Sequence, residues 1–370
     1  MLLTGKRRIV QKTIASARVS RIVFKITLLS TFVLLSGCQD GANSLFPKAE
    51  RPIPHKLILA MKAKGMTSRS PIVMRIFKED SSLEVWKEKD TGRYDLLETY
   101  EICKWSGKLG PKFKEGDRQA PEGFYSVAPA QMNPKSQYHL SFNMGYPNLY
   151  DRSNKRTGTH LMVHGACSSA GCYSMTDDLV EEIYSLARES FKGGQRKFQI
   201  QAFPFRMTPE NMVRHENNEH YEFWKMLKRG SDHFEITKIP PKVDVCEKNY
   251  VFNRTPENGK SFHSSRACPA STIPGRLEAA YIEKVHQDKL AMTDYREKIA
   301  KKENIEKLLG KKDPAQTADI GNSMIVHVNP IDGSATNKPR QTVVVPQPRP
   351  DTAGKKPSNK LKELFSWLRP

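Results

Sequence analysis

The sequence lacks a hydrophobic run long enough to cross a bilayer, for which a helix needs about 20 predominantly apolar residues. The apolar stretch at residues 26–35 is shorter and has the length of a signal-peptide core. The sequence also lacks zinc-finger spacing and basic stripes interleaved with aromatic residues. These absences argue against a nucleic-acid partner and against a metal site, and no cofactor is expected.

Acidic residues are absent from the first 37 positions, which hold seven basic residues. The whole chain of 370 residues has a net charge of +20, so about +13 remains when this segment is set aside. A basic surface suits an anionic polymer or an anionic lipid. At this length the chain can bury the core of one large domain or of two smaller ones.

The N-terminal segment predicts export, because a basic stretch leads into the short apolar core and small residues follow it. The sequence LSGC at residues 35–38 resembles the bacterial lipoprotein box, in which the cysteine is lipidated and becomes the new N-terminus. Cys38 is therefore the predicted lipid anchor of a periplasm-facing envelope protein, and Gln39 favours the outer membrane. The alternative is an ordinary cleaved signal peptide in which Cys38 has no role.

Cysteine is scarce in the rest of the chain. Five cysteines follow position 38, namely Cys103, Cys167, Cys172, Cys246 and Cys268. An exported chain folds in an oxidising compartment, where cysteines form disulfides. Because five is an odd number, at least one thiol stays unpaired and calls for a chemical explanation.

The hydrophobic pattern predicts a β-rich core with one well-defined internal helix. Alternating β-branched, aromatic and polar residues predict strands at 71–77, 82–88, 94–103, 120–129, 136–143, 160–165 and 197–205. Helical spacing, capping residues at its start and two glycines at its end predict a helix at 176–194. Residues 209–235 and 275–311 are also predicted to be helical.

Composition divides the chain into five expected segments. They are a signal peptide at 1–37, a tether at 38–69, a catalytic domain at 70–206, a mostly helical extension at 207–311 and a Pro-rich, disordered basic tail at 312–370.

Residues 161–174, LMVHGACSSAGCYS, carry the strongest chemical signal. One histidine and two cysteines are too few for a structural zinc site. A Cys167–Cys172 disulfide is one interpretation of the pair. The other is a nucleophilic Cys172 with His164 as its base, because a nearby imidazole can take the thiol proton and stabilise the thiolate. The small residues around Ser169 and Gly171 allow backbone N–H groups to face a developing oxyanion.

These residues resemble the signature of the L,D-transpeptidase catalytic domain of the YkuD type. That signature is His-Gly, a gap, then Ser-His-Gly-Cys, and here it reads His164-Gly165 and Ser169-Ala170-Gly171-Cys172. The segments ICKWSGKLGPKFKEGDRQAPEGFY, LSFNMGYPNLYDR, MVHGACSSAGCYSMTDD and AFPFRMT are similar to the YafK-like subgroup. Two departures are Ala170 in place of the usual histidine and a short gap of eight positions between His164 and Cys172.

The resemblance implies a fold, a substrate and a reaction. The expected fold class is a mixed, β-rich L,D-transpeptidase domain, and the expected partner is the peptidoglycan stem peptide. The thiolate of Cys172 would attack the carbonyl after diaminopimelate, with His164 as general acid and base. An amine would resolve the thioester to form a cross-link or attach an envelope lipoprotein. Two alternatives remain: an amidase that hydrolyses diaminopimelate-linked amides, which would detach such a lipoprotein, and a non-catalytic peptidoglycan-binding lipoprotein.

Other roles follow from the matched segments. Four residues are expected to contact substrate: Tyr146, Asn148, Arg152 and Arg206. Simple turn chemistry or a surface salt bridge is the alternative for them. Cys246 is expected to pair with Cys268, and Cys103 with Cys167 is a second candidate pairing.

Overall fold

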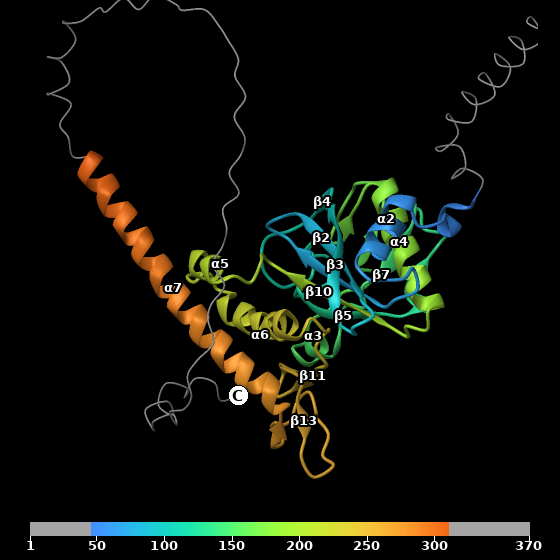
Figure 1. The fold of residues 1–370 in the computed structure, drawn as a ribbon. Helices are drawn as coiled ribbons and strands as arrows, with labels where there is room; N and C mark the ends of the chain where they lie inside the picture. The colour runs from blue at the N-terminus through green and yellow to red at the C-terminus, as the bar shows by residue number, and fades with distance from the viewer. Residues whose placement is uncertain (1–45, 311–370) are drawn as a thin grey trace, which may run out of the picture. The chain divides into compact units, whose positions relative to one another are not determined.

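The computed structural model describes residues 46–310 and contains two five-stranded sheets, two small hairpins and six α-helices within that range (Figure 1). The predicted signal peptide, Cys38 and the predicted tail lie outside the described residues. The chain divides into two compact units at Tyr295, so the extension up to that residue packs with the core. Among residues 46–310, no helix combines the length and the apolar character that a membrane span requires.

The first sheet contains most of the predicted strands. Its order is β3 (Tyr94–Glu101), β2 (Ser82–Glu88), β1 (Ile72–Phe77), β10 (Phe198–Phe203) and β5 (Gly123–Val127). β1 and β10 are parallel, and the other neighbours are antiparallel. The long connection from β5 to β10 contains most of the second sheet and two α-helices.

The second sheet is made of short strands and positions the site. Its order is β4 (Lys104–Trp105), β9 (Tyr173–Ser174), β8 (Met162–His164), β7 (Ser141–Asn143) and β6 (Met132–Asn133). Only β8 and β9 are parallel. Of the strand predicted at 136–143, only the three residues of β7 form a strand. The residues before Ser141 form a loop.

The first sheet is buried on both faces. Ile72, Met74 and Ile76 of β1 belong to the core shared with the second sheet. Val73 and Phe77, which alternate with them, pack into two clusters on the opposite face. Successive side chains of a strand point to opposite faces, so β1 contributes to both layers.

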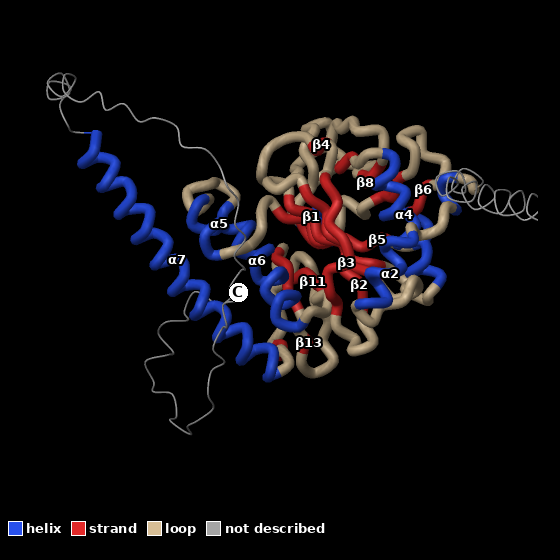
Figure 2. Tube along the Cα trace, turned by 45° about the horizontal axis from the view of Figure 1, so that its top comes forward, coloured by secondary structure: helices blue, strands red, loops and turns tan. Residues whose placement is uncertain are grey.

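Helices cover the two layers (Figure 2). α2 (His55–Ala63) and α4 (Asp177–Lys192) bury apolar side chains in the shared core, while α6 (Tyr221–Thr237) supplies Trp224 and Phe234 to the opposite face. The helix predicted at 176–194 is confirmed by α4, whose N-cap Thr176 accepts a hydrogen bond from the N–H of Leu179.

The tether predicted at 38–69 extends too far. A 3₁₀ turn, η2 (Lys48–Glu50), and helix α2 lie within it, and Ile53, Leu57 and Met61 are buried. Their apolar side chains recur at helical spacing and fill the core beside α4, which composition alone did not indicate. Residues 53–66 therefore belong to the folded unit.

The extension is less helical than predicted. The helix predicted at 209–235 is two helices, α5 (Pro209–Arg214) and α6, separated by a polar turn. Two hairpins follow: β11 (Val243–Cys246) with β12 (Asn249–Phe252), and β13 (Thr255–Pro256) with β14 (Ser271–Thr272). The final predicted helix is present as α7 (Gly275–Gly310). The remaining short elements are η3 (Pro129–Gln131) and α3 (Leu149–Ser153).

Candidate active site

The parallel pairing of β8 and β9 brings the histidine and the cysteine of the motif together. His164 ends β8 and pairs with Ser174 of β9, while Cys172 directly precedes β9. Residues 165–172, called the site loop below, connect the two strands. Because the loop leaves one strand and returns to its hydrogen-bonded neighbour, both side chains reach the same cavity.

His164 is buried, and its tautomer is set by the backbone. Its Nδ1 lies 2.6 Å from the carbonyl oxygen of Gly165. A carbonyl only accepts hydrogen bonds, so Nδ1 carries the proton and Nε2 is the basic nitrogen. Burial lowers the pKa of His164, although the bond to Gly165 acts in the opposite direction. The imidazole is therefore neutral near pH 7 and available as a base.

Cys172 is the one free cysteine among residues 46–310. Its Sγ accepts a hydrogen bond from the N–H of Met162 at 3.4 Å and donates to the carbonyl of His160 at 3.7 Å. Burial raises the pKa of Cys172, and the Met162 N–H and the charge of Lys112 oppose that shift only in part. The resting group is a thiol.

The resting pair differs from the expected thiolate–imidazolium ion pair. Burial disfavours the charged forms of both Cys172 and His164. Within the described residues, no hydrogen bond joins the two side chains, since the thiol contacts His160 and the imidazole contacts Gly165. Proton transfer between them therefore has to accompany substrate binding or attack.

Ser169 and Gly171 hold the site loop in shape. Ser169 Oγ donates to the carbonyl of Cys172 at 2.7 Å and accepts from the N–H of Gly171 at 3.3 Å. Because the proton of Ser169 is used in this way, Ser106 donates to it across 2.9 Å. Gly171 has φ of +136°, a conformation that favours glycine. These contacts support a role of both residues in shaping the site loop. The N–H of Gly171 would have to give up its hydrogen bond to Ser169 before it could bind an oxyanion.

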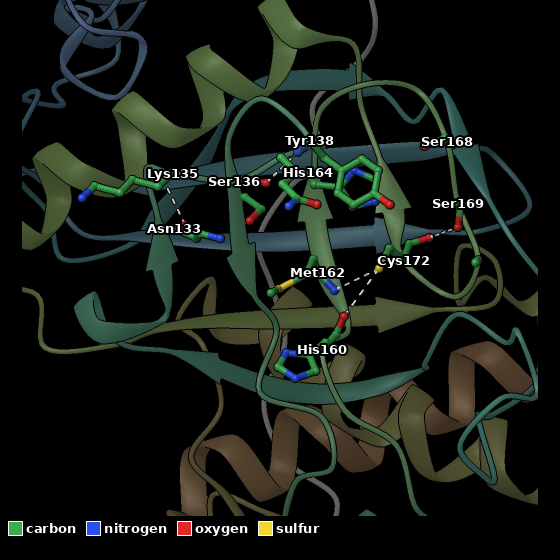
Figure 3. Close-up of a pocket in the computed structure, with 13 residues that line it drawn as sticks. Asn133, Lys135, Ser136, Tyr138, His160, Met162, His164, Ser168, Ser169 and Cys172 are labelled. Atoms are coloured by element: carbon green, nitrogen blue, oxygen red, sulfur yellow. Dashed lines mark hydrogen bonds between the residues drawn. The ribbon is translucent and has the colours of Figure 1, made fainter.

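A cavity of about 510 Å³ opens beside Cys172 (Figure 3). Its lining comes from the segment before β7, from β8 and from the site loop. The lining residues are Asn133, Lys135, Ser136, Gln137, Tyr138, Ser141, His160, Met162, His164, Ser168, Ser169, Ala170 and Cys172. Lys135 is the single fixed cation of this set, and no carboxylate belongs to it. The cavity thus suits a ligand that carries negative charge.

Both predicted disulfides are present. Cys103 bonds to Cys167, which fixes the site loop to the segment after β3, and Cys246 bonds to Cys268 in the extension. The alternative Cys167–Cys172 disulfide is therefore wrong. No group of three or more His, Cys, Asp or Glu side chains in the described part of the chain has the arrangement to hold a metal ion.

Two of the four expected substrate contacts are engaged inside the fold. Tyr146 is buried, and its hydroxyl lies within hydrogen-bond distance of the carbonyls of Lys112 and Thr157. Asn148 caps α3 and donates to the carbonyl of Phe124 at 2.8 Å. Neither residue lines the cavity, and turn and capping chemistry accounts for both.

The two arginines also lie outside the cavity lining. Arg152 donates to the carbonyl of Pro147. Arg206 forms ion pairs with Asp80 at 2.6 Å and with Glu84 at 2.7 Å. Its guanidinium lies over the ring of Phe77 at 4.3 Å from the centroid. A salt bridge between the end of β10 and the β1–β2 hairpin accounts for the position of Arg206.

Sequence reasoning missed the residues that form the opposite wall of the cavity. Tyr138 lies against the His164 ring with 4.8 Å between centroids, and Lys135 and Ser136 precede it in the same loop. The segment was predicted to be a strand, so its side chains were expected to alternate between core and solvent. No pattern in the sequence distinguished Tyr138 from the other alternating residues of the predicted strand, and only the structure shows that its side chain is exposed beside His164.

Comparison with known proteins gives two groups of similar chains. The protein described as "Putative L,D-transpeptidase YafK" in Escherichia coli K12 is 44% identical over 185 residues, which cover 50% of this chain and 75% of the relative. The protein of the same description in Escherichia coli O157:H7 matches to the same extent. No protein-family model matches the sequence.

Solved structures give weaker likenesses. The helical cell shape determining protein Pgp2 from Campylobacter jejuni is 18% identical with a TM-score of 0.30, covering 51% of this chain and 79% of Pgp2. Bd1075 from Bdellovibrio bacteriovorus is 24% identical with a TM-score of 0.26, covering 37% of this chain and 49% of that protein. TM-scores this low do not establish a shared fold.

The structure and the site define a mixed α/β protein in which a free cysteine and a buried neutral histidine share one open cavity. The match to the Escherichia coli proteins, at 44% identity over 75% of their length, establishes the family. The chain belongs to the YafK family of L,D-transpeptidase-like proteins.

Proposed function

We propose that this protein is an L,D-transpeptidase that acts on peptidoglycan stem peptides through a thioester on Cys172. Family membership supports a role at peptidoglycan. The observation that carries the proposal is the shared cavity of Cys172 and His164, with His164 Nδ1 bound to the Gly165 carbonyl. This arrangement leaves the basic nitrogen of a neutral imidazole available to the thiol of the same cavity.

The first half of the reaction forms the thioester. His164 takes the proton of Cys172, and the thiolate attacks the carbonyl carbon between diaminopimelate and the next residue of the stem peptide. The C–N bond of the resulting tetrahedral intermediate breaks, and His164 returns the proton to the leaving amine. The raised pKa of Cys172 and the lowered pKa of His164 keep both groups neutral until substrate binds.

The second half resolves the thioester with an amine or with water. An amine acceptor gives a cross-link or an attached lipoprotein, and water gives hydrolysis. One observation favours the hydrolytic alternative: Ala170 lines the cavity beside Cys172 and offers only a methyl group, where the family signature has a histidine. Such a residue neither binds an incoming amine nor orders a lid, so an amidase that releases diaminopimelate-linked partners is the second candidate.

We also propose that the protein works at the cell envelope, anchored through Cys38. Support comes from the N-terminal sequence, in which an apolar core precedes LSGC. The net charge of about +13 that remains after residue 37 suits anionic envelope polymers and lipids. An envelope lipoprotein is the proposed macromolecular acceptor or substrate.

The test separates the two reactions with two substrates. Purified protein is given disaccharide tetrapeptide with an amine acceptor, and separately a lipoprotein linked to peptidoglycan. Dimer formation without release of lipoprotein supports transpeptidation, and release without dimer supports the amidase. Products that are equal in the wild type and in Cys172→Ala contradict both candidates. A wild type that binds sacculi but yields neither product indicates a non-catalytic binding protein.

A further inference from the structure

A cluster of four ionisable side chains lies beside the turn that follows His164. We call it the His139 cluster, and its members are Arg51, His139, Asp177 and Glu181. His139 Nε2 lies 2.5 Å from a carboxylate oxygen of Glu181, and Nδ1 lies 3.5 Å from Asp177. The second carboxylate oxygen of Glu181 forms an ion pair with the guanidinium of Arg51 at 2.5 Å. None of the four lines the cavity.

His139 is held between two carboxylates. Its Nε2 is hydrogen-bonded to Glu181, and its Nδ1 faces Asp177 across a longer gap. Arg51 lies on the other oxygen of Glu181, so this carboxylate is shared between His139 and Arg51. The side chain of Glu181 is mostly buried, whereas that of Asp177 is half exposed.

The cluster contacts the turn that follows His164. The Oδ1 of Asp177 accepts the N–H of Ala166 at 2.8 Å. The N–H of Gly165 donates to the carbonyls of Tyr138 and Leu140, the two neighbours of His139 in sequence. The packing is close enough that a Cβ added at Gly165 would lie 2.6 Å from Asp177 and 3.0 Å from the Cβ of His139.

The segment before β7, which carries His139, also orients a side chain inside the cavity. Tyr138 lies against the ring of His164 and forms part of the cavity wall (Figure 3). His139 itself has φ of +64°, in the left-handed region. A residue keeps such a conformation when its surroundings fix it, and here the two carboxylates of α4 do so.

We propose that His139 is a positioning residue of the site. Through Glu181 and Asp177 it fixes the turn at Gly165, whose carbonyl sets the tautomer of His164, and it holds Tyr138 against the His164 ring. The inference rests on the proposed function in one respect, since it takes His164 as the base of Cys172. His139 touches neither the thiol nor the cavity, so its effect is on geometry.

The test compares His139→Ala and Glu181→Gln with Glu182→Gln. Glu182 is the matched control: it adjoins Glu181 on α4 with similar burial, but it pairs with Lys56 at 2.9 Å. We expect the first two variants to lower kcat by about 10- to 100-fold with KM nearly unchanged, because small misplacements of a catalytic group cost that much. The control should stay near wild type, and His139→Gln, which keeps a hydrogen-bond donor for Glu181, should recover part of the loss.

Alkylation of Cys172 by iodoacetamide gives a second readout that needs no peptidoglycan. We expect the rate near neutral pH to fall in His139→Ala and Glu181→Gln in parallel with kcat. A wild type without turnover whose alkylation still depends on His139 would refute the proposed function and leave the positioning role standing. Unchanged kcat and alkylation in a folded Glu181→Gln, equal losses in Glu182→Gln, or a change in KM alone would overturn the positioning role.

Discussion

At the scale of single residues, the site is a pair of neutral groups held apart by the backbone. The thiol of Cys172 contacts His160 and the imidazole of His164 contacts Gly165. Burial raises the pKa of the thiol and lowers the pKa of the imidazole. The reactivity of Cys172 toward alkylating agents should therefore increase with pH on the alkaline side of neutrality, where the thiolate forms.

The first prediction concerns the base. His164→Gln should lower turnover by about 10²- to 10⁴-fold, the usual contribution of general acid–base catalysis, without unfolding the domain. Steady-state kinetics with muropeptide measure the loss, and a thermal melt checks the fold. His160→Gln is the comparison, because that side chain lines the same cavity while only its carbonyl meets the thiol. Similar losses in the two variants would argue against a specific role for His164.

The sequence was enough to place His164 and Cys172 close together, but it did not indicate what the other candidate residues contact. His164 and Cys172 lie on neighbouring strands joined by a short loop, so local sequence was enough to place them together. The role of Arg206 depends on Asp80 and Glu84, more than 120 positions away, and no local pattern indicates that contact. Asn148 is the N-cap of α3, and from the sequence alone an asparagine at this position was also compatible with a binding residue.

At the scale of elements, length decided which predictions succeeded. The strands of the first sheet have five to eight residues, and their alternation identified them even though both faces are buried. β4, β6 and β9 have two residues each, too few for an alternating pattern to show in the sequence. The sequence did not predict α2, because its apolar residues directly follow polar residues and were assigned with them to the tether.

The second prediction concerns the disulfide that holds the site loop. The double variant Cys103→Ser/Cys167→Ser should lose about 2–4 kcal/mol of unfolding free energy, since the bond joins positions 64 residues apart. Turnover at low temperature should remain well above that of Cys172→Ala, because Cys172 is untouched. Chemical denaturation and muropeptide kinetics measure the two effects. A double variant as inactive as Cys172→Ala would show that the bond is essential for the site itself.

The third prediction concerns His233 of α6, which is buried against Tyr281. Burial and the charges of Arg229 and Arg254 lower its pKa to about 4. The unfolded chain therefore binds this proton more readily, and stability should fall as pH drops from about 6.5 toward 4, by at most about 1.4 kcal/mol per pH unit.

Denaturation curves at several pH values measure this dependence in the wild type and in His233→Gln. The substitution should flatten the curve between pH 6.5 and 4. Above pH 7, where His233 is neutral in both states, the two proteins should show the same pH dependence. An identical pH dependence in the two proteins would exclude His233 as its source.

At the scale of the whole molecule, the charge of the chain suits the proposed role at an anionic envelope polymer. The described residues up to Tyr295 form one compact unit, in which the extension packs on the face of the first sheet opposite the shared core. About +13 of the chain's net charge of +20 remains after the first 37 residues, which the proposed processing removes. Charge of this sign raises the local concentration of an anionic polymer around the protein.

The fourth prediction concerns the anchor. Cys38→Ser should move the protein from the membrane fraction to the soluble envelope fraction or block its processing, because lipidation requires the cysteine. A single acyl chain binds membranes only marginally, whereas several chains anchor firmly. Fractionation with immunodetection measures the distribution. A Cys38→Ser protein that sediments entirely with membranes would contradict a lipid anchor at this position.

The central claim is that Cys172 becomes acylated by the stem peptide, and peptide mapping by mass spectrometry tests it most directly. The protein is mixed with disaccharide tetrapeptide, quenched in acid within seconds and digested for peptide mapping. The account predicts an added mass equal to the acyl part of the donor on the peptide that contains Cys172, removable by hydroxylamine and absent from Cys172→Ala. Turnover in the wild type together with the same adduct in Cys172→Ala would contradict it.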